Sequence, residues 1–324
     1  MTPALRHLLD VDEWPADDVE LVLTDAARHA GNLHADTLRG YRVALLFAEP
    51  STRTRLSFEI AARSLAAETF VIEPSSSSMV KGETLVDTVR NLDAVGFDIL
   101  VLRHHRAGAP WVAARYFGGA VINAGDGWHA HPTQALLDLL TLRQAFGGAD
   151  LLRGRKVVIV GDLLHSRVAK SNIWTLTQAG ADLWLCGPKP WLRGLDTSPV
   201  TSTSDLGAAL RDADAVMGLR VQRERMAGSA LSLGEYVERY QINSARLQLA
   251  KPGAFFMHPG PINEGVEVTR EVARGPRSLV LQQVRNGVAV RISVFAALQP
   301  PEPRLGGDPT QTSSATRDFW SAIR

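Results

Sequence analysis

Short apolar runs alternate with amphipathic segments along most of the chain. Each run is followed by a polar or glycine-containing stretch, which predicts a strand that ends in a loop. The segments between the runs carry apolar residues at helical spacing. A repeated strand–helix–strand order is typical of parallel sheets flanked by helices. Strands are expected at 43–47, 70–72, 98–102, 120–122, 156–160, 182–185, 215–218 and 254–257.

These strands fall into two groups, and a helix predicted over 132–146 lies between them. Gly147 and Gly148 follow that helix and would end it, because glycine readily takes the left-handed conformation of a helix C-terminus. The pattern therefore predicts an α/β protein with two domains, each a parallel sheet of about four strands flanked by helices. A last helix over 287–298 is apolar on much of its surface and needs a partner face.

Composition and charge exclude several classes of protein. The 324 residues carry a formal net charge of +1, so no global basic character favours nucleic acid. Cys186 is the single cysteine, which rules out a disulfide framework and a cysteine-rich metal site. The N-terminus lacks a signal-peptide pattern, and no apolar run is long enough to span a bilayer. We expect a cytoplasmic protein without nucleic-acid or membrane partners.

The stretch Ser51-Thr52-Arg53-Thr54-Arg55 holds the strongest chemical signal. It follows an expected strand and opens an amphipathic segment over 56–66. Free N–H groups and the positive end of the helix dipole favour an anion at such a position. Arginine adds a planar fork of donors that suits phosphate. The alternative is an ordinary helix cap with solvated arginines.

Other candidate residues follow the first group of strands. Arg103 ends one expected strand, and Lys81 lies on a serine-rich loop before a helix. His131 and Gln134 are three residues apart at the start of the 132–146 helix, so they share one side of it. The neighbours His104 and His105 do not indicate a metal site, because adjacent residues at a strand end are expected to point apart.

The second group of strands presents a similar set. Arg167 lies near a helix start after the 156–160 strand, where Gly161 lacks the further glycines of a dinucleotide-binding turn. Arg220 and Gln222 follow the 215–218 strand. His258-Pro259-Gly260-Pro261 follows the 254–257 strand, and its prolines leave carbonyl groups available as acceptors. Taken singly, Arg167 and Arg220 could be solvated surface arginines, and the 258–261 loop is more commonly only a rigid turn.

Together these motifs resemble the aspartate/ornithine carbamoyltransferase family, and in particular its aspartate branch, over about 41–298. The ornithine branch carries a cysteine in the loop that here reads His258-Pro259-Gly260-Pro261. Arg220 and Gln222 also suit an anionic side chain better than an ammonium group. The matching segments are 47–55, 81–84, 123–127, 131–134, 160–162, 220–222 and 258–261.

The resemblance implies carbamoyl transfer from carbamoyl phosphate to L-aspartate, in pyrimidine biosynthesis, with no metal or organic cofactor. It implies catalytic roles for Thr54, Arg103 and His131. Glu49 would hold a closed form through Arg167 and Arg225. The implied carbamoyl-phosphate-binding residues are Ser51, Thr52, Arg53, Thr54, Arg103, His131, Gln134, Pro259, Gly260 and Pro261, and the aspartate-binding residues are Lys81, Arg167, Arg220 and Gln222.

The resemblance also implies a homotrimer, in which Lys81 enters a neighbouring chain's site. The last helix would return to the first domain. That gives a carbamoyl-phosphate domain of 1–135 plus 286–324 and an aspartate domain of 136–285. Dihydroorotase or regulatory chains are possible partners that the sequence does not decide. Two alternative functions also stay open: carbamoyl transfer to another amino acid such as ornithine, and non-catalytic binding of carbamoyl phosphate. Glu264 departs from relatives that carry arginine there.

Overall fold

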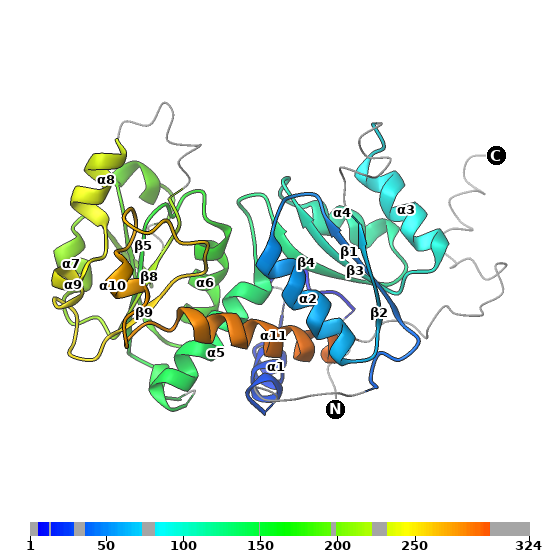
Figure 1. Cartoon of the computed structure of the whole chain (residues 1–324), viewed down its shortest axis with the longest axis horizontal. Helices are drawn as coiled ribbons and strands as arrows, with labels where there is room; N and C mark the ends of the chain where they lie inside the picture. Colours follow the sequence, from blue (N-terminus) through cyan, green and yellow to red (C-terminus); the bar gives the residue numbers. More distant parts are fainter. Residues whose placement is uncertain are drawn as a thin grey trace. The chain divides into compact units, whose positions relative to one another are not determined.

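The computed structural model describes residues 6–12, 14–28, 36–72, 82–148, 150–195, 199–221 and 232–298 (Figure 1). The chain divides into two compact units. The first comprises Met1–Leu9, Asn32–Ala124 and Arg291–Arg324, and the second comprises Asp10–Gly31 and Gly125–Val290. None of the described helices has the length and apolar character needed to cross a membrane.

The first unit is built on a four-stranded sheet in the order β2-β1-β3-β4. Strands β1 and β3 are buried along nearly their whole length, which explains their continuous apolar sequences. Strand β1 pairs in parallel with β2 on one side and with β3 on the other. The elements are β1 (Arg42–Phe47), α2 (Thr52–Ser64), β2 (Glu68–Ile72), α3 (Leu85–Val95), β3 (Ile99–His104), α4 (Ala109–Tyr116) and β4 (Ala120–Asp126).

The second unit is built on a five-stranded sheet in the order β7-β6-β5-β8-β9, and its neighbouring strands all pair in parallel. Its strands are β5 (Lys156–Val160), β6 (Asp182–Cys186), β7 (Thr201–Thr203), β8 (Ala215–Gly218) and β9 (Phe255–Met257). Its helices are α1 (Ala16–Arg28), α5 (Pro132–Phe146), α6 (Arg167–Gln178), α7 (Leu206–Leu210), α8 (Leu233–Tyr240), α9 (Ser244–Leu247) and α10 (Arg270–Ala273), with short 3-10 turns at Asp150–Leu152 and Lys189–Leu192.

Helix α11 (Val280–Ala297) begins in the second unit and ends in the first. Within the first unit, Phe295 packs edge-on against Phe58 of α2 with ring centroids 5.9 Å apart. The guanidinium of Arg291 lies 4.8 Å from the centre of the same Phe58 ring. The apolar surface of this last helix therefore has a partner face on α2.

The predicted fold class is confirmed, with five strands in the second sheet where about four were expected. The additional strand, β7, is too short and polar to produce an apolar run. Helix α2 begins at Thr52, ahead of its expected apolar stretch, because the Ser-Thr-Arg-Thr-Arg residues themselves form its first turn. Helix α11 begins at Val280 and so includes a polar segment that the apolar pattern did not mark. The predicted domain boundaries stay a prediction.

Candidate active site

The N-terminus of α2 forms the first part of the candidate site. Ser51 is the N-cap residue and has an extended backbone (φ −163°, ψ 94°), but its side chain makes no capping hydrogen bond. Ser51 is half-buried, Thr52 and Arg53 are exposed, and Thr54 is buried. A capping hydroxyl would occupy one of the first-turn N–H groups. Because the Ser51 hydroxyl makes no such bond, both the hydroxyl and the first-turn N–H groups are available to an anion at this helix end.

Arg103 lies directly beside this helix start. Strand register pairs Phe47 with Arg103, and the Ala48 N–H donates to the Arg103 carbonyl at 2.9 Å. Only the 48–51 turn then separates β1 from α2. The Arg103 side chain donates to the Ala124 carbonyl at 3.2 Å and is 11% exposed. Parallel pairing thus brings a buried guanidinium and the first turn of α2 to one edge of the sheet.

Glu49 shares this edge through an ion pair with Arg103. The distance from the Arg103 Nη2 to the Glu49 Oε1 is 3.1 Å, and the Glu49 side chain is one-third exposed. The pair fixes the direction of the guanidinium. Lys81 and Arg225 lie outside the described residues, so the predicted roles of Lys81 and of the Glu49 bridge stay predictions.

In the second unit, the starts of α5 and α6 are joined by hydrogen bonds. The backbone N–H of His131, the N-cap of α5, donates to the Ser171 hydroxyl at 3.0 Å. Arg167, the first residue of α6, donates to the Gly127 carbonyl at 3.2 Å. His131 and Gln134 are both buried. These two hydrogen bonds link the start of α6, which carries Arg167, to the start of α5, which carries His131, and to the loop before it.

The loops after β5, β8 and β9 meet at the carboxyl edge of the second sheet. Gly161 has a φ of 139°, and an added Cβ would lie 2.9 Å from the Leu219 Cβ, so only glycine fits this close approach. The Asn263 side chain donates to the Val221 carbonyl at 3.2 Å and ties the loop after β9 to the Arg220 segment. Pro259, Gly260 and Pro261 lie on that loop, whereas Gln222 lies outside the described residues.

Comparison with known proteins agrees with this arrangement. Residues 6–144 match the model described as aspartate/ornithine carbamoyltransferase, carbamoyl-P binding domain. Residues 153–298 match aspartate/ornithine carbamoyltransferase, Asp/Orn binding domain.

The chain belongs to the aspartate/ornithine carbamoyltransferase family.

Named relatives and solved structures extend this result. The aspartate carbamoyltransferase catalytic subunit of Roseiflexus sp. (strain RS-1) is 48% identical over 304 residues, 90% of this chain and 95% of the relative. Aspartate transcarbamoylase from Trypanosoma cruzi, solved with N-(phosphonacetyl)-L-aspartic acid, has a TM-score of 0.80 at 28% identity, covering 92% and 96% of the two chains. Ornithine carbamoyltransferase from Pyrococcus furiosus has a TM-score of 0.81 at 28% identity, covering 92% and 98%.

The histidine pair of this family member corrects one expectation. The rings of His104 and His105 stack with centroids 4.3 Å apart and an interplanar angle of 23°, so they do not point apart. The reason is that β3 ends at His104 and the chain bends at His105, which breaks the alternation of a strand. Among the described residues, no group of three or more His, Cys, Asp or Glu side chains is arranged to hold a metal ion.

Two perturbed acids of this family member are buried groups rather than predicted site residues. Burial raises the pKa of Asp10 to about 7, and the nearby Asp126 carboxylate adds to the rise while the Val11 N–H opposes it. Burial likewise raises the pKa of Cys186 to about 12. A thiol with so high a pKa is not a nucleophile at neutral pH, so Cys186 acts as a core residue.

Glu264 has a partner that explains its charge. Its Oε1 accepts from Arg274 Nε at 2.9 Å and from Arg274 Nη2 at 2.6 Å. The Glu264 carboxylate is therefore paired within its own unit, with an arginine ten residues further along the chain.

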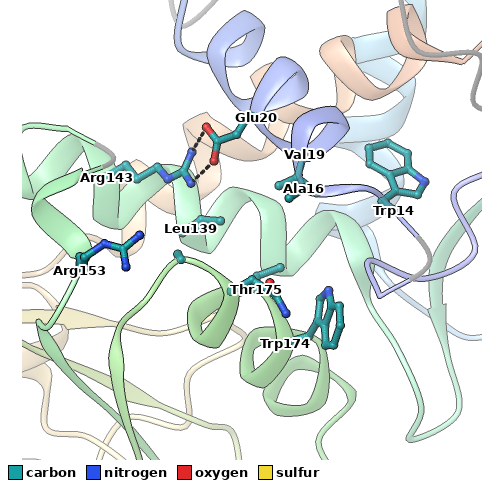
Figure 2. A pocket seen from close by; sticks show the side chains of 11 residues that line it. Trp14, Ala16, Val19, Glu20, Leu139, Arg143, Arg153, Trp174 and Thr175 are labelled. Carbon is teal, nitrogen blue, oxygen red and sulfur yellow. Dashed lines mark hydrogen bonds and ion pairs between the residues drawn. The ribbon is translucent and has the colours of Figure 1, made fainter. Parts of the chain in front are cut away.

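One pocket of the second unit, of about 290 Å³, lies between α1, α5 and α6 (Figure 2). Glu20 and Arg143 form a two-pronged ion pair on its wall, and Trp14 and Trp174 line another part (Figure 2). None of the predicted site residues lines it.

Sequence reasoning missed a buried polar cluster that includes the predicted site residue Gln134. Asp138 is fully buried and accepts hydrogen bonds from three side-chain amides. A signal was available in the sequence, because polar residues recur at 134, 138 and 141 along the 134–142 stretch of α5, which is otherwise apolar. That spacing places all three on one face. The donors to Asp138 are Gln134, Asn172 and Gln283.

Proposed function

We propose that this protein transfers the carbamoyl group of carbamoyl phosphate to L-aspartate, giving N-carbamoyl-L-aspartate and phosphate. The observation that carries the proposal is the strand register that sets Arg103 beside the open first turn of α2. A guanidinium and a helix N-terminus at one point suit a phosphate dianion. Relatives named aspartate carbamoyltransferase catalytic subunit support the choice of acceptor.

The first unit supplies the phosphate site in this proposal. Ser51, Thr52 and Arg53 bind phosphate oxygens through hydroxyl, N–H and guanidinium groups. Thr54 and Arg103 also face the carbonyl oxygen of the carbamoyl group. Ion pairing with Glu49 keeps the Arg103 fork oriented before substrate arrives, so little reorganisation is needed during the reaction.

The second unit supplies groups for the carbamoyl amide and for aspartate. His131 joins Thr54 and Arg103 in stabilising the oxyanion. Gln134 and the carbonyls of the loop Pro259, Gly260 and Pro261 accept from the carbamoyl NH2 group. Arg167 and Arg220 each bind one carboxylate of aspartate. Gln222 and Lys81, which lie outside the described residues, complete the aspartate-binding set.

The chemistry needs no metal or organic cofactor. The aspartate amine attacks the carbonyl carbon, and a tetrahedral intermediate forms with negative charge on the carbonyl oxygen. The bond to the phosphate oxygen then breaks, and the leaving phosphate accepts the amine proton. Catalysis therefore rests on positioning and on charge stabilisation. We place the reaction in pyrimidine biosynthesis in the cytoplasm.

We also propose a homotrimer with shared sites. Leu56 and Ile60 are four residues apart on α2 and are 45% and 50% exposed, so one face of this helix is apolar and open. Phe70 and Val71 of the edge strand β2, which packs beside α2, are also exposed. Open apolar surface of this kind marks an interface.

Complementation tests the shared site. Lys81→Gln and Arg103→Ala trimers should each be nearly inactive. If Lys81 serves a neighbouring chain's site, mixed trimers regain sites in which neither lesion is present, and activity returns. If mixed trimers form but stay inactive, each site lies within one chain, and the shared site is wrong.

An assay of phosphate release with a panel of amino acids tests the reaction. Aspartate should support turnover, and ornithine should not, because two arginines select a dicarboxylate. Equal or better turnover with ornithine would favour the other branch of the family, to which the Pyrococcus furiosus neighbour belongs. Carbamoyl-phosphate binding without turnover for any amino acid would favour a non-catalytic role.

A further inference from the structure

The buried carboxylate of Asp138 touches one of the groups proposed to hold the carbamoyl NH2. Asp138 Oδ1 accepts from Gln134 Nε2 at 2.9 Å. Both residues lie on α5, one turn apart, with Asp138 fully buried. A carboxylate accepts hydrogen bonds and does not donate them when it is ionised. The Gln134 amide must therefore turn its nitrogen toward Asp138 and its oxygen away.

The same carboxylate oxygen also controls the loop after β9. Gln283 Nε2 donates to Asp138 Oδ1 at 2.7 Å, and Gln283 Oε1 accepts from the His258 backbone N–H at 2.9 Å. Gln283 is thus oriented by Asp138 in the same way as Gln134. Through it, the carboxylate fixes the first residue of the loop that carries Pro259 and Gly260.

A third amide completes the cluster. Asn172 Nδ2 of α6 donates to Asp138 Oδ2 at 2.9 Å and to the Val168 carbonyl at 3.0 Å. All of these side chains are at least nine-tenths buried. Three donors around a buried carboxylate offset the free-energy cost of removing its charge from water. Loss of any one donor would restore part of that cost, so the three side chains are held in a fixed arrangement.

We propose that Asp138 is a positioning residue that sets the carbamoyl-amide specificity of the site. It holds Gln134 with its oxygen toward substrate, so that this group accepts from NH2 and does not offer a second donor. Through Gln283 it also holds the loop after β9, whose carbonyls accept from the same NH2. The inference rests on the proposed function and adds the reason that its NH2-binding groups are acceptors.

Binding without any amino acid tests the inference separately from turnover. Phosphonoacetamide carries the phosphonate and the NH2 group in one stable molecule, whereas inorganic phosphate lacks the NH2. Calorimetry on Asp138→Ala should show a loss of about tenfold or more in phosphonoacetamide affinity, since hydrogen bonds to the NH2 lose their alignment. Affinity for inorganic phosphate should stay within about twofold of the wild-type value, because the residues proposed to bind phosphate belong to the first unit.

Thr141→Ala is the matched control. Thr141 is fully buried one turn further along α5, and its hydroxyl accepts from Asn286 of α11 at 2.8 Å. Both variants break a buried bond between the same two helices. If Asp138 were only a structural tie, both should lower the melting temperature and neither should change the preference for phosphonoacetamide over phosphate.

A double-mutant cycle sharpens the result. Once Gln134→Ala has removed the acceptor, adding Asp138→Ala should cost less than it does alone, because part of its effect passes through Gln134. Full additivity would overturn the link between the two residues. An unchanged ligand preference in folded Asp138→Ala would overturn the inference itself.

The wild-type protein provides a test if Asp138→Ala does not fold. In a crystal structure with phosphonoacetamide, the Gln134 atom turned away from Asp138 should lie about 3 Å from the ligand NH2. Contact of that atom with the ligand carbonyl oxygen would refute the inference. Aspartate-dependent phosphate release decides the proposed function independently, so failure of one leaves the other standing.

Discussion

The two units of the chain hold their candidate groups by different means. In the first, a guanidinium and a helix N-terminus are brought together by strand register, and one ion pair orients them. In the second, the buried Asp138 accepts from Gln134 in the first turn of α5 and from Gln283, which accepts in turn from the loop after β9. The first arrangement concentrates positive charge, whereas the second fixes which atom of an amide faces outward. Around Arg103 the first unit supplies charge, whereas around Asp138 the second unit sets the direction of hydrogen bonds.

Arg103→Ala gives the strongest test of charge in the first unit. It removes the cation that we propose faces the developing oxyanion, and kcat should fall about a hundredfold to a thousandfold. Arg103→Lys keeps the charge but loses the planar fork, so its loss should be smaller. Steady-state kinetics with saturating substrates measure both. Melting curves separate this effect from loss of the Arg103 bond to the Ala124 carbonyl, and a well-folded variant with near wild-type kcat would contradict the role.

Arg220→Ala asks whether the second unit also contributes charge. We expect the KM for aspartate to rise about 10- to 100-fold, since a hydrogen bond to a charged group is typically worth about 1.5–3 kcal/mol. The KM for carbamoyl phosphate should change little. Arg239→Ala, an exposed arginine of α8, is the matched control and should leave both constants unchanged. Equal effects of the two variants would show that Arg220 acts only through net charge.

The sequence predicted groups that follow strands better than groups that support them. Ser51, Arg103 and Arg220 stand at or shortly after the end of an apolar run, Arg167 opens the helix after one, and parallel sheets place such ends at one edge. The hydrogen bonds to Asp138 come from residues 172 and 283, which are far from it in the chain, so no local sequence pattern connects the three residues.

The same limit applies to the elements. Helix α5 was predicted at its observed bounds, because proline opens it and Gly147 closes it with a φ of 90°. The start of α11 was missed because its first turns hold the polar residues Gln282, Gln283 and Asn286, which donate to α5; Gln283 and Asn286 are buried. Polar residues of this kind look like loop in a hydrophobicity pattern, and only tertiary packing makes them helix interior.

Glu49→Gln tests whether the charge site of the first unit acts alone. The observed ion pair with Arg103 would weaken, and an effect confined to this unit should change carbamoyl-phosphate affinity. If Glu49 also bridges to Arg167 and Arg225, loss of that bridge should instead raise the KM for aspartate. The rise should be about tenfold, the scale of one charge-assisted hydrogen bond. We expect the aspartate effect to be the larger. Unchanged aspartate kinetics would remove Glu49 from domain closure.

Glu264→Arg should have the smallest effect, because it changes charge without touching either arrangement. The Glu264–Arg274 pair is exposed, with side chains 36% and 61% accessible. Exposed pairs contribute about 0–1 kcal/mol, so urea unfolding should show a loss within that range, slightly increased by repulsion between two arginines. We expect kcat and both KM values to stay near wild type. Glu264→Gln, which removes the pair without adding a like charge, separates the two contributions. A change in aspartate KM for Glu264→Arg but not for Glu264→Gln would mean that the field of this position reaches the substrate, and that charge in the second unit matters beyond its two arginines.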